Sequence, residues 1–244
     1  MLLPNAYLDV VDRALAEDLG SGDVTTEATV DESTSARATV VARQPLVVCG
    51  GEVFFAVFRR IDASVRCEKL VDDGAKVERG AALWRVEGAA RSLLMGERVS
   101  LNLSQRMSGV ATLTRAFVEQ IPEGCTTRVV DTRKTTPVLR ALERHAVRVG
   151  GGHNHRDNLS SAVLIKDNHI VAAGGIERAV ERARQHAPHT SRIEIEVANL
   201  AEFDRALALG CEIIMIDNFS TPDMLEAVRR GRGKAILEVS GGVR

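Results

Sequence analysis

Residues 192–218, RIEIEVANLAEFDRALALGCEIIMIDN, contain two apolar runs rich in β-branched residues with an amphipathic pattern between them. The runs at 192–197 and 213–216 have the length and composition of buried strands, and the apolar residues of 200–209 recur at helical spacing. A strand, a helix and a second strand in this order predict two parallel strands joined by a crossover helix. The segment therefore predicts an α/β fold built on a parallel sheet.

The same alternation extends over the second half of the chain. Strands are predicted at 127–130, 162–165, 192–197, 213–216 and 235–239, and helices at 137–147, 176–187, 200–209 and 222–230. In a barrel of parallel strands, the carboxyl ends of all strands open onto one face, and that face holds the active site. We therefore expect the residues that follow these strands to share one site.

The first half of the chain has a different pattern. Residues 5–19 predict a helix, and 36–86 hold short β-branched runs that glycines separate and a predicted helix at 51–60 interrupts. A long helix is predicted over 91–120, with a break allowed at Gly109. This pattern predicts a small sheet-rich domain followed by a connecting helix.

The composition is that of a globular protein with a sizeable core, since 45% of the 244 residues are hydrophobic and 27% are charged. A net charge of -1 excludes a broad field that would bind nucleic acid or an anionic membrane. No apolar run approaches the roughly 18 to 20 residues that span a bilayer, and no charged-then-apolar leader opens the chain. We expect a cytoplasmic protein with two domains, residues 1–110 and 111–244.

Polar and charged residues follow strand after strand in the second half of the chain. These strand ends are Asp131-Thr132-Arg133-Lys134, Lys166-Asp167-Asn168-His169, Glu196, Asp217-Asn218 and Ser240-Gly241-Gly242. A glycine-rich loop at 150–156 would deliver His155 and Arg156 beside the same opening. A series of this kind predicts a ligand site rather than a set of solvated loops.

The residue types of these strand ends indicate an anionic ligand. Four cations are expected to converge there: Arg133, Lys134, Arg156 and Lys166. Guanidinium and ammonium groups suit carboxylates and phosphates. Glu196 and Asp217 offer hard oxygen ligands, which suit magnesium carried by a polyphosphate. The backbone N–H groups of 240–242 could hold a phosphate.

Ten segments in order along the chain resemble those of quinolinate phosphoribosyltransferases. They are AEDLGSGDVTT at 16–26, GER at 96–98, Asn102, QRMSGVAT at 105–112, DTRKTTP at 131–137, NHR at 154–156, KDNH at 166–169, EIEV at 194–197, DN at 217–218 and SGG at 240–242. The resemblance runs from about Glu17 to Val243. It implies an N-terminal α/β sandwich and a C-terminal incomplete, TIM-like α/β barrel.

The resemblance also implies a reaction. Enzymes of this family join quinolinate to 5-phosphoribosyl 1-pyrophosphate, release pyrophosphate and CO2, and give nicotinate mononucleotide for NAD biosynthesis. It implies Mg2+ as cofactor and a homodimer, or a higher even oligomer, in which Arg98 reaches the neighbouring subunit's site. The residues that match the binders of the two quinolinate carboxylates are Arg133, His155, Arg156 and Lys166.

The phosphoribosyl side of the site follows from the same resemblance. The residues that match it are Lys134, Glu196, Asp217, Ser240, Gly241 and Gly242, and Thr132 belongs to the same binding run. Glu196 and Asp217 are the predicted metal ligands. Lys134, Lys166, Glu196 and Asp217 are the residues expected to take part in the chemical step. The family continues beyond the Ser-Gly-Gly segment with further elements, so the barrel is expected to be truncated at its C terminus.

The residues leave other functions open. A related phosphoribosyltransferase, nicotinate-specific or of the molybdenum-associated ModD type, would use a different acceptor. An aldolase barrel would use Lys166 to form a Schiff base with a carbonyl substrate. A carrier-like binding module could be built on residues 36–90, although the expected hairpin tip has no lysine to modify.

Several other residues are expected to be structural. The four cysteines lack CxxC spacing and are expected to be buried small hydrophobic residues rather than metal ligands: Cys49, Cys67, Cys125 and Cys211. Three histidines near arginine-rich helices are expected at the surface: His145, His186 and His189. Trp84 is expected in the core. His169 would either support Lys166 or contact a phosphate.

Overall fold

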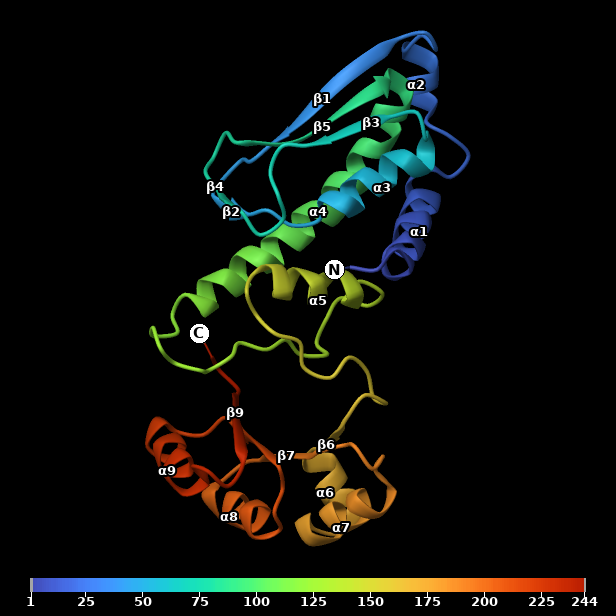
Figure 1. Cartoon of the computed structure of the whole chain (residues 1–244). Helices are drawn as coiled ribbons and strands as arrows, with labels where there is room; N and C mark the ends of the chain where they lie inside the picture. Colours follow the sequence, from blue (N-terminus) through green and yellow to red (C-terminus); the bar gives the residue numbers. More distant parts are fainter. Residues whose placement is uncertain (1, 244) are drawn as a thin grey trace. The chain divides into compact units, whose positions relative to one another are not determined.

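Helix α4 (Ala90–Val118) is the central element of the first of two units in this computed structural model, which describes residues 2–243. The unit spans Met1–His155. The helix runs without interruption through Gly109, so the break allowed there does not occur. Helices α1 (Leu8–Leu19) and α3 (Gly51–Ile61) pack against it (Figure 1). Their apolar sides form one buried cluster, because all three are amphipathic.

An antiparallel sheet lies beside these helices. Its strands have the order β1 (Ser35–Val41), β5 (Ala82–Ala89) and β3 (Arg66–Lys69), and β2 (Leu46–Val47) pairs with β4 (Lys76–Val77) separately. Trp84 of β5 is 1% exposed, and its ring centroid lies 5.0 Å from that of Phe54 on α3. The predicted sheet-rich domain and the core position of Trp84 are both confirmed.

The rest of the first unit contains η1 (Pro4–Ala6), α2 (Val24–Thr29) and α5 (Arg140–Val149). Helix α2 was not predicted, and it begins where the Asp23 carboxylate accepts a hydrogen bond from the Thr26 amide at 3.0 Å. The predicted strand at 127–130 is wrong. Only Val130 forms a β-bridge, and its partner is His153 rather than a strand of a sheet.

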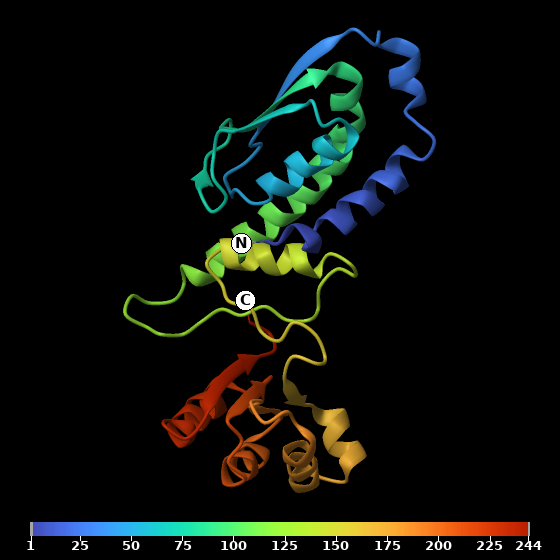
Figure 2. The ribbon, with the colours of Figure 1, turned by 45° about the vertical axis from the view of Figure 1, so that its right-hand side comes forward.

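The second unit, Arg156–Arg244, is a parallel sheet with crossover helices (Figure 2). Its strands lie in the order β6 (Val163–Ile165), β7 (Ile193–Val197), β8 (Ile213–Asp217) and β9 (Ile236–Ser240). Its helices are α6 (Asp167–Ala173), α7 (Ile176–His186), α8 (Leu200–Ala208) and α9 (Thr221–Gly231). The buried cluster of the sheet and helices includes Ile195, Phe203 and Ile214. The parallel α/β prediction for this part of the chain is confirmed.

Three expectations about single residues are corrected. All four cysteines are free, but Cys125 is exposed and Cys67 is only half-buried. His186 and His189 lie at the surface as expected, whereas His145 is half-buried and its Nδ1 atom is shielded from solvent.

No helix among residues 2–243 is long and apolar enough to cross a membrane.

Ser108 attaches helix α4 to the segment that precedes α3. Its Oγ accepts a hydrogen bond from the Cys49 amide at 3.1 Å and donates one to the Cys49 carbonyl at 3.0 Å, and all of these groups are buried. Ser104, one helical turn away and equally buried, bonds only to carbonyls of its own helix. The two serines therefore form a matched pair for measuring this attachment.

Replacing Ser108 with alanine should destabilise the protein by about 2 to 4 kcal/mol, because two buried backbone groups of Cys49 lose their partners. Ser104→Ala should cost less than about 1 kcal/mol, since helical carbonyls already have backbone donors. Urea denaturation followed by circular dichroism measures both free energies of unfolding. Equal losses in the two variants would contradict the role given to Ser108.

Candidate active site

Two segments that follow no regular strand lie side by side in the first unit. The amide of His153 donates to the Val129 carbonyl at 2.8 Å, and the Asp131 amide donates to the His153 carbonyl at 3.1 Å. These bonds align residues 129–131 with 153–155 in parallel. The predicted site segments DTRKTTP and NHR therefore begin next to each other, although more than a dozen residues separate them in sequence.

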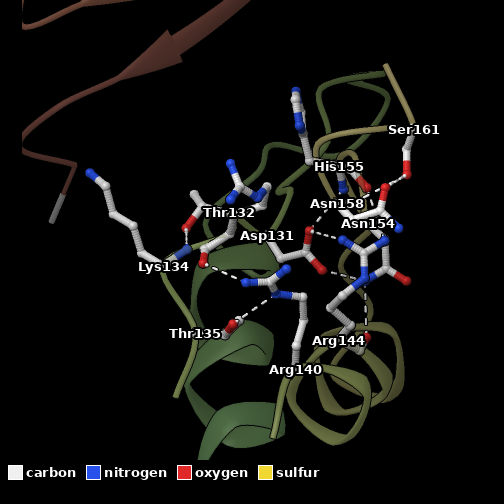
Figure 3. Close-up of polar contacts among 11 residues, drawn as sticks. Asp131, Thr132, Lys134, Thr135, Arg140, Arg144, Asn154, His155, Asn158 and Ser161 are labelled. Carbon is white, nitrogen blue, oxygen red and sulfur yellow. Dashed lines mark hydrogen bonds and ion pairs between the residues drawn. The ribbon is translucent and has the colours of Figure 1, made fainter. Parts of the chain in front are cut away.

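The Asp131 carboxylate joins the two segments and helix α5. Its side chain is 6% exposed, and it accepts hydrogen bonds from the His155 amide at 2.8 Å, from Nη1 of Arg144 at 3.2 Å and from the Asn154 side chain. Arg144 also donates to the His155 carbonyl at 2.9 Å. Figure 3 shows the side chains of Lys134 and His155 extending away from this carboxylate. Asp131 thus anchors the backbone from which the predicted ligand-binding side chains extend.

Residues 132–135 form a short turn whose side chains are held by local bonds. The Lys134 amide donates to Oγ1 of Thr132 at 3.0 Å, and Nε of Arg140 donates to Oγ1 of Thr135 at 3.0 Å. Nε of Arg133 is buried and has no hydrogen-bond partner among the described residues. A buried guanidinium donor without a protein acceptor is a candidate contact for an anionic ligand.

A second buried carboxylate supports the end of this turn. Glu143 of α5 accepts from Arg106 of α4, with its Oε1 at 3.0 Å from Nε and 2.7 Å from Nη2, and from the Thr136 amide at 3.3 Å. Burial alone would raise the pKa of Glu143, but hydrogen bonds from Thr136 and Arg106 outweigh it and lower the pKa below 4.5. Glu143 is therefore ionised at neutral pH and holds Arg106 beside Thr136.

Arg98 lies on α4 with an exposed side chain. Its Nη2 atom is 3.9 Å from the carboxylate of Glu97, a weak contact at the edge of the ion-pair range. The structure therefore places Arg98 at the surface of the first unit.

The second unit carries its predicted residues at the carboxyl ends of the parallel strands. Nζ of Lys166, which follows β6, lies 2.6 Å from Oε2 of Glu196 on β7, and the Glu196 side chain is 16% exposed. Because β6 and β7 pair in parallel, their ends lie at the same edge of the sheet. An aldolase lysine attacks a carbonyl carbon through Nζ, whereas Nζ of Lys166 is bound to the Glu196 carboxylate.

Helix α6 begins directly after Lys166, and His169 caps it. Nδ1 of His169 accepts a hydrogen bond from the Lys166 amide at 2.9 Å, and the His169 amide donates to the Lys166 carbonyl at 2.8 Å. No helix was predicted after this strand end, but the polar KDNH segment forms the N-cap and first turn of α6. His169 therefore contacts the backbone of Lys166, and a contact of His169 with a phosphate stays a prediction.

Strands β8 and β9 end together. Asp217 pairs with Ser240, and the Asn218 amide donates to the Ser240 carbonyl at 3.0 Å. Gly241 has a φ of 85°, and a Cβ there would lie 2.2 Å from Oδ1 of Asn218. Only glycine fits this close approach, so the Gly-Gly pair brings backbone N–H groups to the strand ends without side chains in the way.

Arg156 lies at the start of the second unit, where its Nη1 donates to the Ala162 carbonyl at 3.3 Å. The predicted site residues are thus divided between the two units. Those of the first unit are Arg98, Thr132, Arg133, Lys134 and His155, and those of the second are Arg156, Lys166, Glu196, Asp217, Ser240, Gly241 and Gly242. Their roles in binding and catalysis remain predictions.

Comparisons with known proteins agree along the whole chain. Residues 23–108 match the family described as "Quinolinate phosphoribosyl transferase, N-terminal domain", and residues 110–244 match the corresponding C-terminal domain. The chain belongs to the quinolinate phosphoribosyltransferase family. The expected domain boundary at residue 110 remains a prediction, since the compact units divide after His155.

Individual relatives of this phosphoribosyltransferase match nearly all of this chain and 86–87% of their own length. A nicotinate-nucleotide pyrophosphorylase [carboxylating] of Mycobacterium leprae is 42% identical, with 98% of this chain and 86% of that protein covered. A probable enzyme of the same description from Methanocaldococcus jannaschii is 38% identical, with 100% and 87% covered. The crystal structure of NadC from Streptococcus pyogenes is 41% identical, with a TM-score of 0.94 and 100% and 86% covered.

Sequence reasoning missed the residues that hold the site of this phosphoribosyltransferase together. Arg144 has no motif of its own and looks like one more cation on an arginine-rich helix. Asp131 and Arg106 lie within conspicuous segments, but nothing local shows that their side chains are structural. Their partners, Arg144 and Glu143, come from helix α5, so the packing of that helix decides both contacts.

Glu143→Gln should make the free energy of unfolding less dependent on pH in the acid range. The folded pKa of Glu143 lies below its ordinary value of 4.5, so the charge stabilises the fold fully above pH 4.5 and progressively less as the pH falls through the folded pKa. The wild type should exceed the variant by about 1 to 3 kcal/mol at pH 7. The difference should shrink in urea titrations below pH 4.5.

Glu123→Gln, at an exposed position, is the matched control and should leave the unfolding curves unchanged at both ends of the pH range. A Glu143→Gln difference that is constant from pH 7 to pH 3 would contradict the proposed contribution of the charge.

Proposed function

We propose that this chain transfers the phosphoribosyl group of 5-phosphoribosyl 1-pyrophosphate to quinolinate and yields nicotinate mononucleotide, pyrophosphate and CO2. The observation that carries this proposal is the match to both domains of the family over residues 23–244. The family membership makes the chain a nicotinate-nucleotide diphosphorylase (carboxylating), a phosphoribosyltransferase of NAD biosynthesis. The match of residues 23–108 to the N-terminal domain of the family also argues against a carrier-like module at residues 36–90.

The acceptor side of the reaction requires cations around two carboxylates. The quinolinate ring nitrogen attacks C1 of the ribose and the bond from C1 to the pyrophosphate oxygen breaks, so that the nitrogen becomes positively charged. Loss of the carboxylate next to the nitrogen then releases CO2 and leaves an electron pair on the ring carbon, which takes up a proton. Fixing both carboxylates aligns the nitrogen for the attack. The proposed binders are Arg133, His155, Arg156 and Lys166.

Arg133 is supported most directly as a carboxylate binder. Its buried Nε–H has no acceptor among the described residues, whereas the neighbouring Arg140 and Arg144 both donate to protein oxygens. A quinolinate carboxylate would satisfy that donor. This difference separates the arginine proposed to bind substrate from the arginines that support the backbone.

The phosphoribosyl side is assigned to Lys134, Glu196, Asp217 and the 240–242 backbone, with Thr132 in the same binding run. When pyrophosphate leaves, positive charge develops on the sugar, and carboxylates beside it lower the barrier. Lys166 holds Glu196 in position through Oε2, which leaves Oε1 to face a ligand. Lys134, Lys166, Glu196 and Asp217 are the residues proposed to act in this step.

Mg2+ fits the same donor set. Carboxylate oxygens are its preferred protein ligands, and it usually binds through one or two carboxylates together with substrate phosphates. Glu196 and Asp217 would hold it, and when bound it would neutralise charge on the leaving pyrophosphate. Oδ2 of Asp217 accepts from Nδ2 of Asn218 at 2.8 Å, which orients the carboxylate.

We further propose that the active form is a homodimer, or a higher even oligomer, in which Arg98 serves the neighbouring site. A groove of about 1030 Å³ runs beside α4 in the first unit, lined by apolar side chains of β1 and α4. Leu94 and Leu113 are 47% and 62% exposed along it, and Glu97, next to Arg98, also lines it. Exposed apolar surface of this extent is typical of an interface.

A cytoplasmic location is proposed on chemical grounds. All four cysteines are free thiols, as is usual in a reducing compartment. Quinolinate and 5-phosphoribosyl 1-pyrophosphate are the partners proposed for the enzyme, and neither nucleic acid nor a membrane is among them.

The purified chain should form nicotinate mononucleotide and CO2 from quinolinate, 5-phosphoribosyl 1-pyrophosphate and Mg2+, and should form no product from nicotinate. Arg133→Ala should lower kcat/KM by at least about 100-fold, because a buried charge pair with the substrate is lost. Arg128→Ala, an exposed arginine of the same unit, is the control and should stay within about twofold of the wild type. Product from nicotinate, or an Arg133→Ala variant as active as the control, would overturn the assignment.

Mixing two inactive variants tests the role of Arg98 across the interface. Arg98→Ala and Arg133→Ala chains should each be inactive, and their heterodimer should contain one site with both arginines. After random exchange of subunits, the mixture should recover about a quarter of the wild-type rate. No recovery, in a mixture whose exchange is confirmed by native mass spectrometry, would mean that Arg98 acts within its own chain, and an active Arg98→Ala chain would mean that Arg98 is not needed.

A further inference from the structure

Three side chains with different donor atoms meet in the first unit, outside the proposed active site. Sγ of Cys49, a carboxylate oxygen of Asp73 and a ring nitrogen of His145 all lie within 4.8 Å of one another. Cys49 precedes α3, Asp73 lies in the turn between β3 and β4, and His145 is on α5. Packing of the unit thus brings together three segments that are far apart in sequence.

The cluster has an unsatisfied polar atom. Nδ1 of His145 is buried and has no hydrogen-bond partner among the described residues. Buried polar groups almost always have partners, so an unpartnered ring nitrogen on a residue that lies beside a thiol and a carboxylate points to a bound species.

Two of the three groups are held in place by backbone contacts. Oδ2 of Asp73 accepts from the Gly50 amide at 2.8 Å, and its Oδ1 accepts from the Gly51 amide at 3.2 Å. The Cys49 backbone is fixed to α4 through Ser108. A carboxylate with two donors and a thiol on a fixed backbone form a preorganised set of ligands.

The cluster does not have the properties of a nucleophilic triad. Cys49 is 0% exposed, so no substrate reaches its sulfur. Burial, together with the negative charge of Asp73, raises the pKa of the Cys49 thiol well above its usual range. Reactive cysteines are partly exposed and have a lowered pKa, so this cysteine has the opposite character.

We propose that Cys49, Asp73 and His145 bind one divalent cation of the Zn2+ type as a structural site. Thiolate, imidazole and carboxylate are the three protein ligands that Zn2+ accepts, with metal–ligand distances of about 2.0 to 2.3 Å. In a tetrahedron these distances separate the donor atoms by about 3 to 4 Å, a small contraction from the observed cluster. The bound ion takes the place of the thiol proton, which passes to solvent, and a water molecule fills the fourth position.

The site would stabilise the support of the proposed active site. His145 directly follows Arg144, the residue that bonds Asp131 and the His155 carbonyl. An ion held by His145 would attach α5 to the turn at Asp73 and to the start of α3. The ion therefore takes no part in the reaction, and its effect is on the stability of the first unit.

The test uses the full chain, freed of metal with a chelator and then titrated with Zn2+ or Co2+ alone. One ion should bind per chain, Co2+ should show a thiolate charge-transfer absorption, and Zn2+ should raise Tm by about 5 °C or more at about 100 times its Kd. Cys49→Ala and His145→Gln should each weaken binding by at least about 100-fold, since they remove a ligand. Cys49→Ala should also abolish the thiolate absorption.

Cys211→Ala, a buried thiol of the second unit, and His186→Ala, an exposed histidine, are the matched controls and should bind the ions as the wild type does. Circular dichroism identifies any variant that fails to fold. If Cys49→Ala does not fold, His145→Gln alone tests the loss of a ligand. Absence of a thiolate band in the folded wild type would overturn the proposal. So would equal Zn2+ affinity in the wild type and in both ligand variants.

Discussion

The buried carboxylate of Asp131 is the contact on which the first unit's half of the site depends. Residues 129–131 and 153–155 belong to no sheet, and the two backbone bonds that form their one β-bridge would hold them poorly. Asp131 adds bonds to the His155 amide, to Arg144 and to Asn154, in a place where its side chain is 6% exposed. A charge at low exposure needs all of its partners, so the segments and helix α5 are fixed together. Because Asp131 fixes this backbone, the nearby side chains of Arg133 and Lys134 are candidates for binding a ligand.

The second unit positions its residues by a different physical constraint. Parallel pairing brings the strand ends to one edge, and the ends carry few contacts beyond the Lys166–Glu196 ion pair and the bonds of Asn218. The absence of a Cβ at Gly241 lets the chain pass within contact of the Asn218 side chain. Charged contacts therefore position the predicted residues of the first unit, whereas sheet register, one ion pair and a glycine position those of the second.

Sequence patterns predicted the parallel strands well because a buried strand needs a continuous β-branched run, which is visible locally. They failed at 127–130, where a run of the same kind pairs only through Val130 with a loop residue. They also missed α6, because its first turn consists of the polar residues expected to bind ligand and is capped by His169. In both places a local pattern was compatible with two structures, and contacts with distant residues selected one.

The amino-acid sequence by itself determined the α/β class, the order of strands and helices in the second unit, and the family, since these depend on residue periodicity and on motifs in a fixed order. Only the tertiary structure distinguished residues of the same type by their contacts: Arg144 donates to Asp131 and to the His155 carbonyl, whereas the buried Nε of Arg133 has no partner among the described residues. The tertiary structure alone also brings Cys49, Asp73 and His145 together. No local spacing encodes this meeting, because it arises from the packing of α5 against the turn between β3 and β4.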